Sequence, residues 1–128
     1  MSETAGISIS GLSKSFGETT VLRDISLEIE PGERVVIIGP SGTGKSTLLR
    51  SLNFLDQPDR GLIRVGDLTV DAAQASRADI LALRRSTSFV FQNYALFANK
   101  TAQQNITQAL ITVKGLSRPE ADARAEAI

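Results

Sequence analysis

The segment GPSGTGKST, Gly39 to Thr47, decides the fold of this chain of 128 residues. From Gly39 to Ser46 it matches the pattern G-x-x-x-x-G-K-[ST] at every fixed position. A run of β-branched residues precedes it, so we predict a strand over Arg34 to Ile38 that is covered on both faces, as in a parallel sheet. A helix is predicted from Lys45 to Leu52. This order of strand, glycine-rich loop and helix predicts an α/β fold of the P-loop NTPase class.

The residue types of this loop suit a site for phosphate groups. Glycines keep β-carbons away and let backbone N–H groups wrap around phosphate oxygens, while the following helix directs about half a positive charge at the same point. Lys45 would bind the β- and γ-phosphates, Ser46 would give its hydroxyl to Mg²⁺, and Thr47 would contact the α-phosphate. The candidate phosphate-binding residues are Gly39, Ser41, Gly42, Thr43, Gly44, Lys45, Ser46 and Thr47.

Two alternatives remain open at the level of the loop itself. A glycine-rich loop that only links a strand to a helix needs no ligand. The motif also does not separate an ATPase from a GTPase or a small-molecule kinase, so residues outside the loop have to decide.

The composition excludes several classes of function. Lysine plus arginine equals aspartate plus glutamate, at 14 each, so the basic excess of a phosphate-backbone binder is absent and we expect no nucleic-acid partner. The chain has no cysteine and no histidine, which excludes disulfides, thiolate metal sites and a histidine general base. The first residues, Met1 to Ala5, lack the basic and apolar regions of a signal peptide.

The rest of the chain alternates short strands and capped helices. Half-buried strands are predicted at Ile7 to Leu12 and at Val21 to Ile29, and a short strand at Thr87 to Phe91. A turn at Pro31-Gly32 and a hairpin around Gly66-Asp67 are also predicted. A helix is predicted at Ala78 to Arg85, with Ser76 as its N-cap and Asp79 three residues on. Further helices are predicted after a capping pair Thr101/Gln104 and after a second pair Ser117/Glu120. Arg84 and Arg85 are interpreted as a solvated helix end rather than a phosphate clamp.

Segments on both sides of the loop resemble ABC-transporter ATPase subunits. Upstream, the resemblance lies in Leu12 to Gly17, Val21 to Leu27 and Pro31 to Glu33. Downstream, Val90-Phe91-Gln92 and the residues from Leu96 to Asn105 resemble the Q-loop region of that family. Within the family, Phe91 to Phe97 and Val113 to Gly115 are most similar to the subunits of polar amino-acid importers.

The resemblance implies roles for further residues. Phe16 stands where the family places an aromatic ring that stacks on adenine, and Val21 would flank the base or ribose; a strand-end or core phenylalanine is the alternative. Gln92 stands at the Q-loop glutamine, which would contact Mg²⁺ and assist catalysis with Lys45; a solvated glutamine is the alternative. The ligands implied are ATP and Mg²⁺. Residues 93–100 would meet a transmembrane partner, unless Tyr94, Leu96 and Phe97 are buried in the chain's own core.

The resemblance also implies an architecture and an assembly. Residues 1–128 would be part of an ABC ATPase domain, with the ATP-binding core at 1–92 and the start of a helical subdomain at 93–128. The partners implied are permease subunits of an ABC transporter and a second ATPase subunit, on the inner face of the cell membrane in the cytoplasm. Ala98-Asn99 departs from the Pro-His that many members carry at the segment that would meet the partner.

Several family elements do not occur in these residues. The sequence has no LSGGQ signature, no apolar run followed by Asp-Glu, and no switch histidine. Without the catalytic glutamate of the Asp-Glu pair, the attacking water is not positioned, so we expect no hydrolysis by this chain alone. In the family, the parallel neighbours of strand 34–38 also come from later sequence.

The unpaired strand leads to a competing hypothesis. An apolar strand without neighbours invites association, so the chain would be a truncation that is ordered by swapping or pairing with another copy, or by rearranging. The alternatives are therefore a non-catalytic fragment that self-associates, with weak or no nucleotide binding, and an ABC-type ATPase that acts outside transport.

Overall fold

The computed structural model describes residues 5–128, which form two compact units. The first unit ends at Phe89, and the second runs from Val90 to Ile128. The assignment of residues 1–92 and 93–128 to separate functional parts stays a prediction. The prediction that Met1 to Ala5 lack a signal peptide concerns residues of which all but Ala5 lie outside the described part of the chain.

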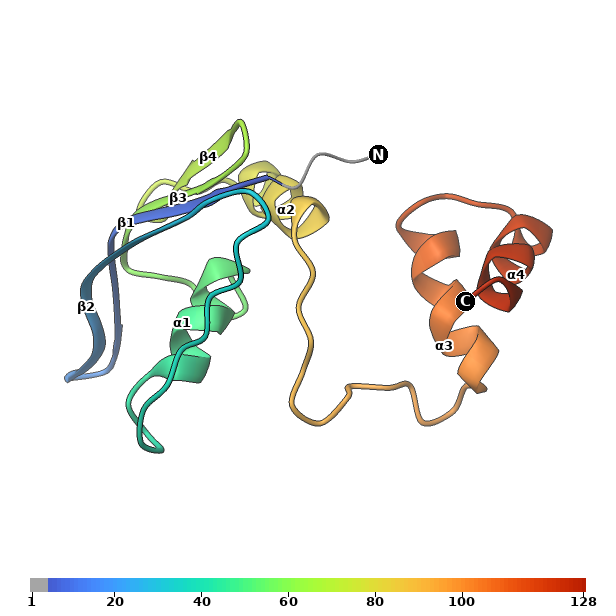
Figure 1. The fold of residues 1–128 in the computed structure, drawn as a ribbon, viewed down its shortest axis with the longest axis horizontal. Helices are drawn as coiled ribbons and strands as arrows, with labels where there is room; N and C mark the ends of the chain where they lie inside the picture. The colour runs from blue at the N-terminus through green and yellow to red at the C-terminus, as the bar shows by residue number, and fades with distance from the viewer. Residues whose placement is uncertain (1–4) are drawn as a thin grey trace. The chain divides into compact units, whose positions relative to one another are not determined.

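The first unit contains a four-stranded antiparallel sheet (Figure 1). Its strands are β1 (Ile7–Phe16), β2 (Thr19–Ile29), β3 (Arg60–Val65) and β4 (Leu68–Asp71), in the spatial order β2-β1-β3-β4. On the central strand β1, Ile9 pairs with Leu27 of β2 and with Ile63 of β3. The predicted N-terminal strands and the hairpin around Gly66-Asp67 are confirmed.

Two helices accompany this sheet and share its apolar core. They are α1 (Lys45–Leu52) and α2 (Arg77–Ser86), both predicted from the sequence. In α2, the Ser76 hydroxyl accepts from the backbone N–H of Asp79, and the Asp79 carboxylate accepts from the N–H of Ser76, which is the predicted cap. The core consists of buried residues from strands and helices: Ile9, Leu12, Leu22, Leu48, Phe54, Ile63, Val65, Val70, Ala72 and Leu83.

The predicted turn at Pro31-Gly32 is confirmed. Gly32 has a φ of 82°, in the left-handed region that glycine adopts without a steric cost. The backbone N–H of Glu33 donates to the carbonyl of Glu30, and the Glu33 carboxylate accepts from the N–H of Glu30 at 2.9 Å. This turn ends β2 and directs the chain toward the glycine-rich loop.

Two strands predicted from apolar runs are absent, and those predictions are wrong. Residues 34–38 and 87–91 form no strand in the structure, and Val36 and Ile38 are 80% and 90% exposed. The reason is that a strand exists only through hydrogen bonds to a neighbour. The described sheet is antiparallel throughout and pairs neither segment.

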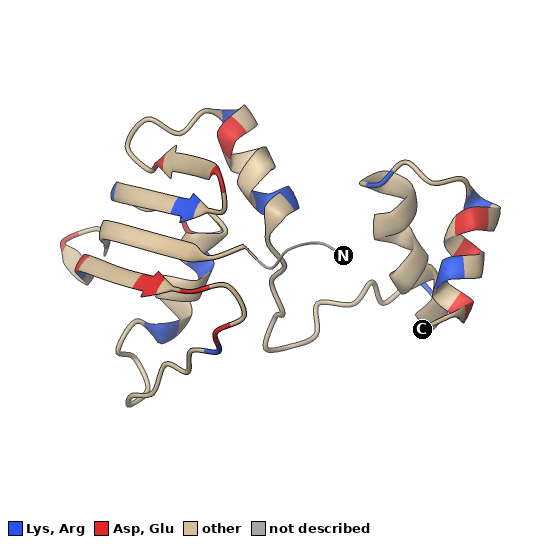
Figure 2. Ribbon diagram, turned by 45° about the horizontal axis from the view of Figure 1, so that its top comes forward, with Lys and Arg blue, Asp and Glu red and all other residues tan. Residues whose placement is uncertain are grey.

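The second unit is a pair of helices, α3 (Ala102–Thr112) and α4 (Arg118–Glu126). Thr101 and Gln104 form the predicted capping box of α3, and Ser117 and Glu120 that of α4. Figure 2 shows both red and blue bands along α4, so acidic and basic side chains are mixed on this helix. No helix in residues 5–128 is long and apolar enough to cross a membrane.

Candidate functional site: a phosphate loop at the start of α1

The glycine-rich loop ends where α1 begins. Gly44 is the residue that precedes the first helical turn, and its φ of 92° lies in the left-handed region. Because glycine has no side chain, no side-chain cap covers the first amides of α1, whereas α2 and α3 begin with capping boxes. No acidic residue occupies the first turn of α1 either. The N-terminal amides of α1 can therefore bind an anion.

Gly44 also lies tightly against β2. A β-carbon at position 44 would lie 3.0 Å from Cγ1 of Val21, 3.3 Å from its carbonyl oxygen, and 3.4 Å from Cδ2 of Leu22. A larger residue does not fit without displacing β2. Glycine at this position thus permits both the left-handed backbone conformation and the close approach between α1 and β2.

The ammonium group of Lys45 lies within the loop itself. It donates hydrogen bonds to the carbonyl oxygens of Gly39 and Pro40, at 2.8 and 2.5 Å, and lies 3.4 Å from the Thr43 hydroxyl. The Thr43 hydroxyl in turn donates to the carbonyl of Pro40 at 2.8 Å. These contacts bring the two ends of the loop together around one positive charge.

The remaining loop residues present small polar groups. Ser41 and Gly42 are exposed at the tip, Ser46 is exposed in the first turn of α1, and Thr47 is half-buried. An exposed serine hydroxyl at a helix N-terminus is a suitable ligand for Mg²⁺, with phosphate oxygens and water completing the shell. The residues present therefore fit both a phosphate chain and its metal ion.

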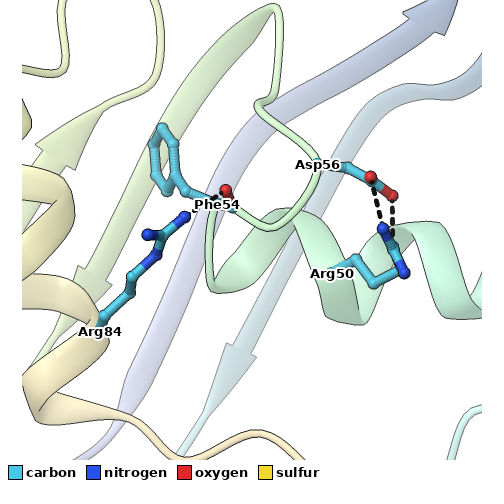
Figure 3. A network of polar contacts seen from close by, with 4 residues as sticks. All are labelled: Arg50, Phe54, Asp56 and Arg84. Carbon is cyan, nitrogen blue, oxygen red and sulfur yellow. Dashed lines mark hydrogen bonds and ion pairs between the residues drawn. The ribbon is translucent and has the colours of Figure 1, made fainter. Parts of the chain in front are cut away.

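The C-terminal end of α1 is held by a side chain from α2. Arg84 donates to the carbonyl oxygens of Asn53 and Phe54, at 3.1 and 2.9 Å, and Figure 3 shows it reaching Phe54. Phe54 is buried and has a φ of 53°, so the chain reverses sharply there. Arg84 is exposed in the last turn of α2, which agrees with its interpretation as a solvated helix end, and its guanidinium in addition caps α1.

Two further polar contacts fix the same end of α1. Arg50 forms a two-pronged pair with the Asp56 carboxylate, with nitrogen–oxygen distances of 2.8 and 3.0 Å (Figure 3). The hydrogen bond from Arg50 holds the pKa of Asp56 below its usual value. The Asn53 amide donates to the Thr87 hydroxyl at 2.7 Å, just after α2 ends. The helix that carries the loop is thus anchored at the end away from it.

The two residues expected near a nucleotide base lie on the β1–β2 hairpin. Phe16 ends β1, pairs with Thr19 and is 48% exposed. Val21 is half-buried and lies against Gly44, as described above. The structure thus brings Val21 to the loop and leaves the Phe16 ring accessible on the same hairpin. Phe16 is a strand-end residue and does not belong to the buried core.

Gln92 belongs to the second unit and lies in an exposed turn. The side chains that follow it are exposed as well, which settles one open alternative. Tyr94, Leu96 and Phe97 have exposed fractions of 83%, 70% and 54%, so none of them is buried in the chain's own core.

The segment after Gln92 is attached to α3 by Asn105. The Asn105 side-chain oxygen accepts from the backbone N–H of Phe97 at 2.8 Å, and its nitrogen donates to the carbonyls of Phe97, Lys100 and Thr101. Sequence reasoning assigned no role to Asn105 or to Arg84. Both act on backbone groups, so neither leaves a complementary side chain to be found in the sequence.

Sequence relatives identify the family. The family model described as "ABC transporter" matches residues 22–128. Among curated proteins, the chain is 51% identical over 90% of its length to the probable amino-acid import ATP-binding protein YxeO of Bacillus subtilis (strain 168), of which it covers 46%. It is 48% identical over 94% of its length to the L-cystine transport system ATP-binding protein TcyN of Escherichia coli (strain K12), of which it covers 50%. The chain thus spans about half the length of these relatives.

A solved structure shows the same fold. The dimeric ATP-binding cassette MJ0796, determined in a post-hydrolysis state bound to ADP and Pi, matches with a TM-score of 0.78 and 30% sequence identity. The match covers 94% of this chain and 54% of that one. The fold is therefore that of an ABC ATPase, represented in part. Together with the match of the family model to residues 22–128, this shows that the chain belongs to the ABC transporter family.

Proposed function

We propose that this chain binds ATP as part of the ATPase subunit of an ABC transporter that imports a small polar solute, namely an amino acid. The observation that carries the proposal is the start of α1. There an uncapped helix N-terminus follows a complete phosphate-loop motif, with Gly44 seated against Val21. The similarity to YxeO, a probable amino-acid import protein, and to TcyN, of an L-cystine transport system, supports the class of solute.

In this proposal the loop holds the triphosphate of ATP. Backbone amides from residues 39–44 and the first turn of α1 would surround the phosphate oxygens, and Lys45 would exchange its carbonyl partners for the β- and γ-phosphates. Thr47 would contact the α-phosphate, while Ser46 and Gln92 would be the protein's ligands to Mg²⁺. The metal ion would neutralise charge on the β- and γ-phosphates.

The base would lie at the β1–β2 hairpin. An exposed aromatic ring offers a flat apolar surface for stacking, and the half-exposed Phe16 provides one. Val21 contacts the loop and would flank the ribose or the base. These two roles distinguish a nucleotide site from a site for phosphate alone.

The partners follow from the same proposal. Permease subunits would dock on the exposed apolar residues of the segment after Gln92, at the cytoplasmic face of the membrane. A second ATPase subunit would complete the nucleotide site, as the dimeric state of MJ0796 suggests for this fold. We expect no hydrolysis from these residues alone, because they contain neither an LSGGQ signature nor an Asp-Glu pair after an apolar run.

The proposal is tested by measuring binding and hydrolysis side by side. We expect MgATP to bind to the chain with no turnover above background. Lys45→Ala should abolish binding, because the loop then loses its only full charge directed at the phosphates. Lys114→Ala, which removes an exposed lysine of the second unit, should leave binding unchanged. Absence of MgATP binding to the unaltered chain would refute the proposal.

A second candidate function rests on the exposed apolar segment 35–38. Val36 and Ile38 are 80% and 90% exposed, and an extended segment with apolar side chains and no strand partner is prone to association. We propose self-association of this chain through that segment. Sedimentation of the chain should show oligomers that the double variant Val36→Thr, Ile38→Thr reduces, with Val90→Thr, also 90% exposed, as the control. A monomeric chain at all concentrations would exclude it.

A further inference from the structure

A lysine ammonium group lies over one face of the aromatic ring at the end of β1. The ammonium nitrogen of Lys14 lies 4.8 Å from the centroid of the Phe16 ring. That distance is within the range of a cation–π contact, in which the cation is attracted to the electron-rich face of the ring. The Phe16 residue is still 48% exposed, so the contact leaves part of the ring accessible.

Lys14 is fixed in place and is not a freely moving surface charge. Its side chain is only 14% exposed, although lysine side chains normally extend into water. The Asp59 carboxylate lies 3.7 Å from the ammonium group. The pKa of Asp56 is lowered mainly by its hydrogen bond from Arg50, with a smaller contribution from the charge of Lys14.

The carboxylate that holds Lys14 is itself anchored to the strand. The backbone N–H of Ser15 donates to the other oxygen of Asp59 at 2.6 Å, and the N–H of Asp59 donates to the carbonyl of Ser13 at 2.9 Å. Asp59 therefore has a fixed position next to β1. Asp59 thus positions the Lys14 ammonium group through an ion pair, and the ammonium group contacts the Phe16 ring through a cation–π interaction.

The hairpin connects this ring to the phosphate loop. Phe16 pairs with Thr19 at the start of β2, and Val21, two positions further on, lies against Gly44. The Phe16 ring therefore lies at the same end of the hairpin as Val21, the residue that contacts the loop.

We propose that Lys14, held by Asp59, is a positioning residue that orients the Phe16 ring for stacking on the base of the bound nucleotide. This inference rests on the proposed function, since it needs a nucleotide at the loop. The cation covers one face of the ring and restricts its rotation, so the accessible face is ordered before the ligand arrives. Such ordering lowers the cost of binding the base and leaves the phosphate contacts unchanged.

The test compares MgATP with inorganic tripolyphosphate, which has the phosphate chain but no base. Lys14→Met keeps an apolar stem and removes the charge. We expect this variant to bind MgATP about three- to tenfold more weakly and tripolyphosphate equally well. Arg23→Met is the matched control, because Arg23 is an exposed cation on the same hairpin without a hydrogen bond or ion pair to any residue that the structure describes. It should change neither affinity.

A double-mutant cycle separates positioning from general electrostatics. In a Phe16→Leu background, Lys14→Met should cause no further loss of MgATP affinity, because there is no ring to orient. Asp59→Asn should give the same pattern as Lys14→Met with a smaller loss. Thermal unfolding of each variant shows whether it is folded. If Lys14→Met does not fold, the affinities of Asp59→Asn for MgATP and tripolyphosphate decide the test.

The outcomes separate this inference from the proposed function. Equal losses for MgATP and tripolyphosphate, or an undiminished loss in the Phe16→Leu background, would overturn the role of Lys14 while leaving the loop as a phosphate site. If the unaltered chain binds neither ligand, the proposed function fails and this inference fails with it.

Discussion

Val21 lies so close to Gly44 that a β-carbon at position 44 would come within 3.0 Å of its Cγ1 atom. The helix that follows the loop and the strand that precedes it are thus in contact through a residue without a side chain. The contact joins the hairpin, which carries Phe16, to the helix, which carries Lys45.

Replacing this glycine should affect both the fold and the loop. We expect Gly44→Ala to lower the free energy of unfolding by about 1–3 kcal/mol, because it combines a left-handed backbone with a steric clash. Urea unfolding measures the change. Gly42→Ala is the matched control, since Gly42 has a φ of 81° but no atom within 4 Å of the added β-carbon. Equal losses for the two variants would show that the approach to Val21 has no effect on stability.

The guanidinium cap on α1 predicts different effects for two neighbouring arginines. We expect Arg84→Ala to cost about 1 kcal/mol or more, because the carbonyls of Asn53 and Phe54 lose their donor. Arg85→Ala should change stability by less than about 0.5 kcal/mol, as is usual at exposed positions. Chemical denaturation of the two variants makes the comparison. A larger loss for Arg85→Ala would contradict the cap.

Asn105 should control the order of the segment before α3. Asn105→Ala removes the side-chain oxygen that accepts from the N–H of Phe97, so amide exchange at Phe97 should become faster, by about tenfold for a net loss of about 1.4 kcal/mol. Gln103→Ala, an exposed substitution in the same helix, should leave this exchange rate unchanged. Unchanged protection of Phe97 in the Asn105 variant would show that other contacts hold the segment.

The capping boxes of α2 and α4 predict a loss of stability in acid. Hydrogen bonds from the hydroxyl and N–H of Ser76 lower the pKa of Asp79 below its ordinary 3.8, and those of Ser117 lower the pKa of Glu120 below 4.5. An acid whose pKa is lowered by folding contributes stability above its unfolded pKa. That contribution is lost as the pH falls through the lower, folded value. Below about pH 4.5, α4 should therefore loosen, and α2 should follow at lower pH.

The acid effect is measured by circular dichroism or by amide exchange in the two helices. Asp79→Asn should remove the part that arises in α2, because the amide does not titrate in this range. Asp67→Asn is the control, since Asp67 lies in the turn after β3 and its side chain has no hydrogen-bond partner in residues 5–128. Helices that keep full protection down to about pH 2 would contradict the prediction.

The accuracy of the sequence predictions follows from how local each signal is. The helices after Ser76, Thr101 and Ser117 are predictable because each cap and its partner lie within one turn of each other. The hairpin around Gly66-Asp67 is predictable because its signal, a two-residue turn between adjacent strands, is also local. Residues 34–38 and 87–91 have the composition of strands, but composition does not supply the neighbouring strand that a ladder needs.

In the candidate site, too, local features are predictable from the sequence and contacts between distant residues are not. The loop, its motif and its helix were visible in the sequence because they are contiguous. The cap from Arg84, the attachment by Asn105 and the charge of Lys14 on Phe16 were not assigned, because each depends on where the chain folds back. The roles of Gln92 and of the phosphate-binding residues stay predictions.

In the proposed function, the position of the Lys45 ammonium group makes phosphate binding a substitution of one set of partners for another. Its bonds to the carbonyls of Gly39 and Pro40 have to break as the phosphates enter, so the incoming anion competes with the loop's own dipoles. The enthalpy of binding is then the difference between the bonds of Lys45 to the phosphates and its bonds to the loop carbonyls. It is therefore smaller in magnitude than the enthalpy of the phosphate bonds alone. Because the ammonium group bonds to the carbonyls of Gly39 and Pro40, the helix residue Lys45 also ties the start of the loop to its end.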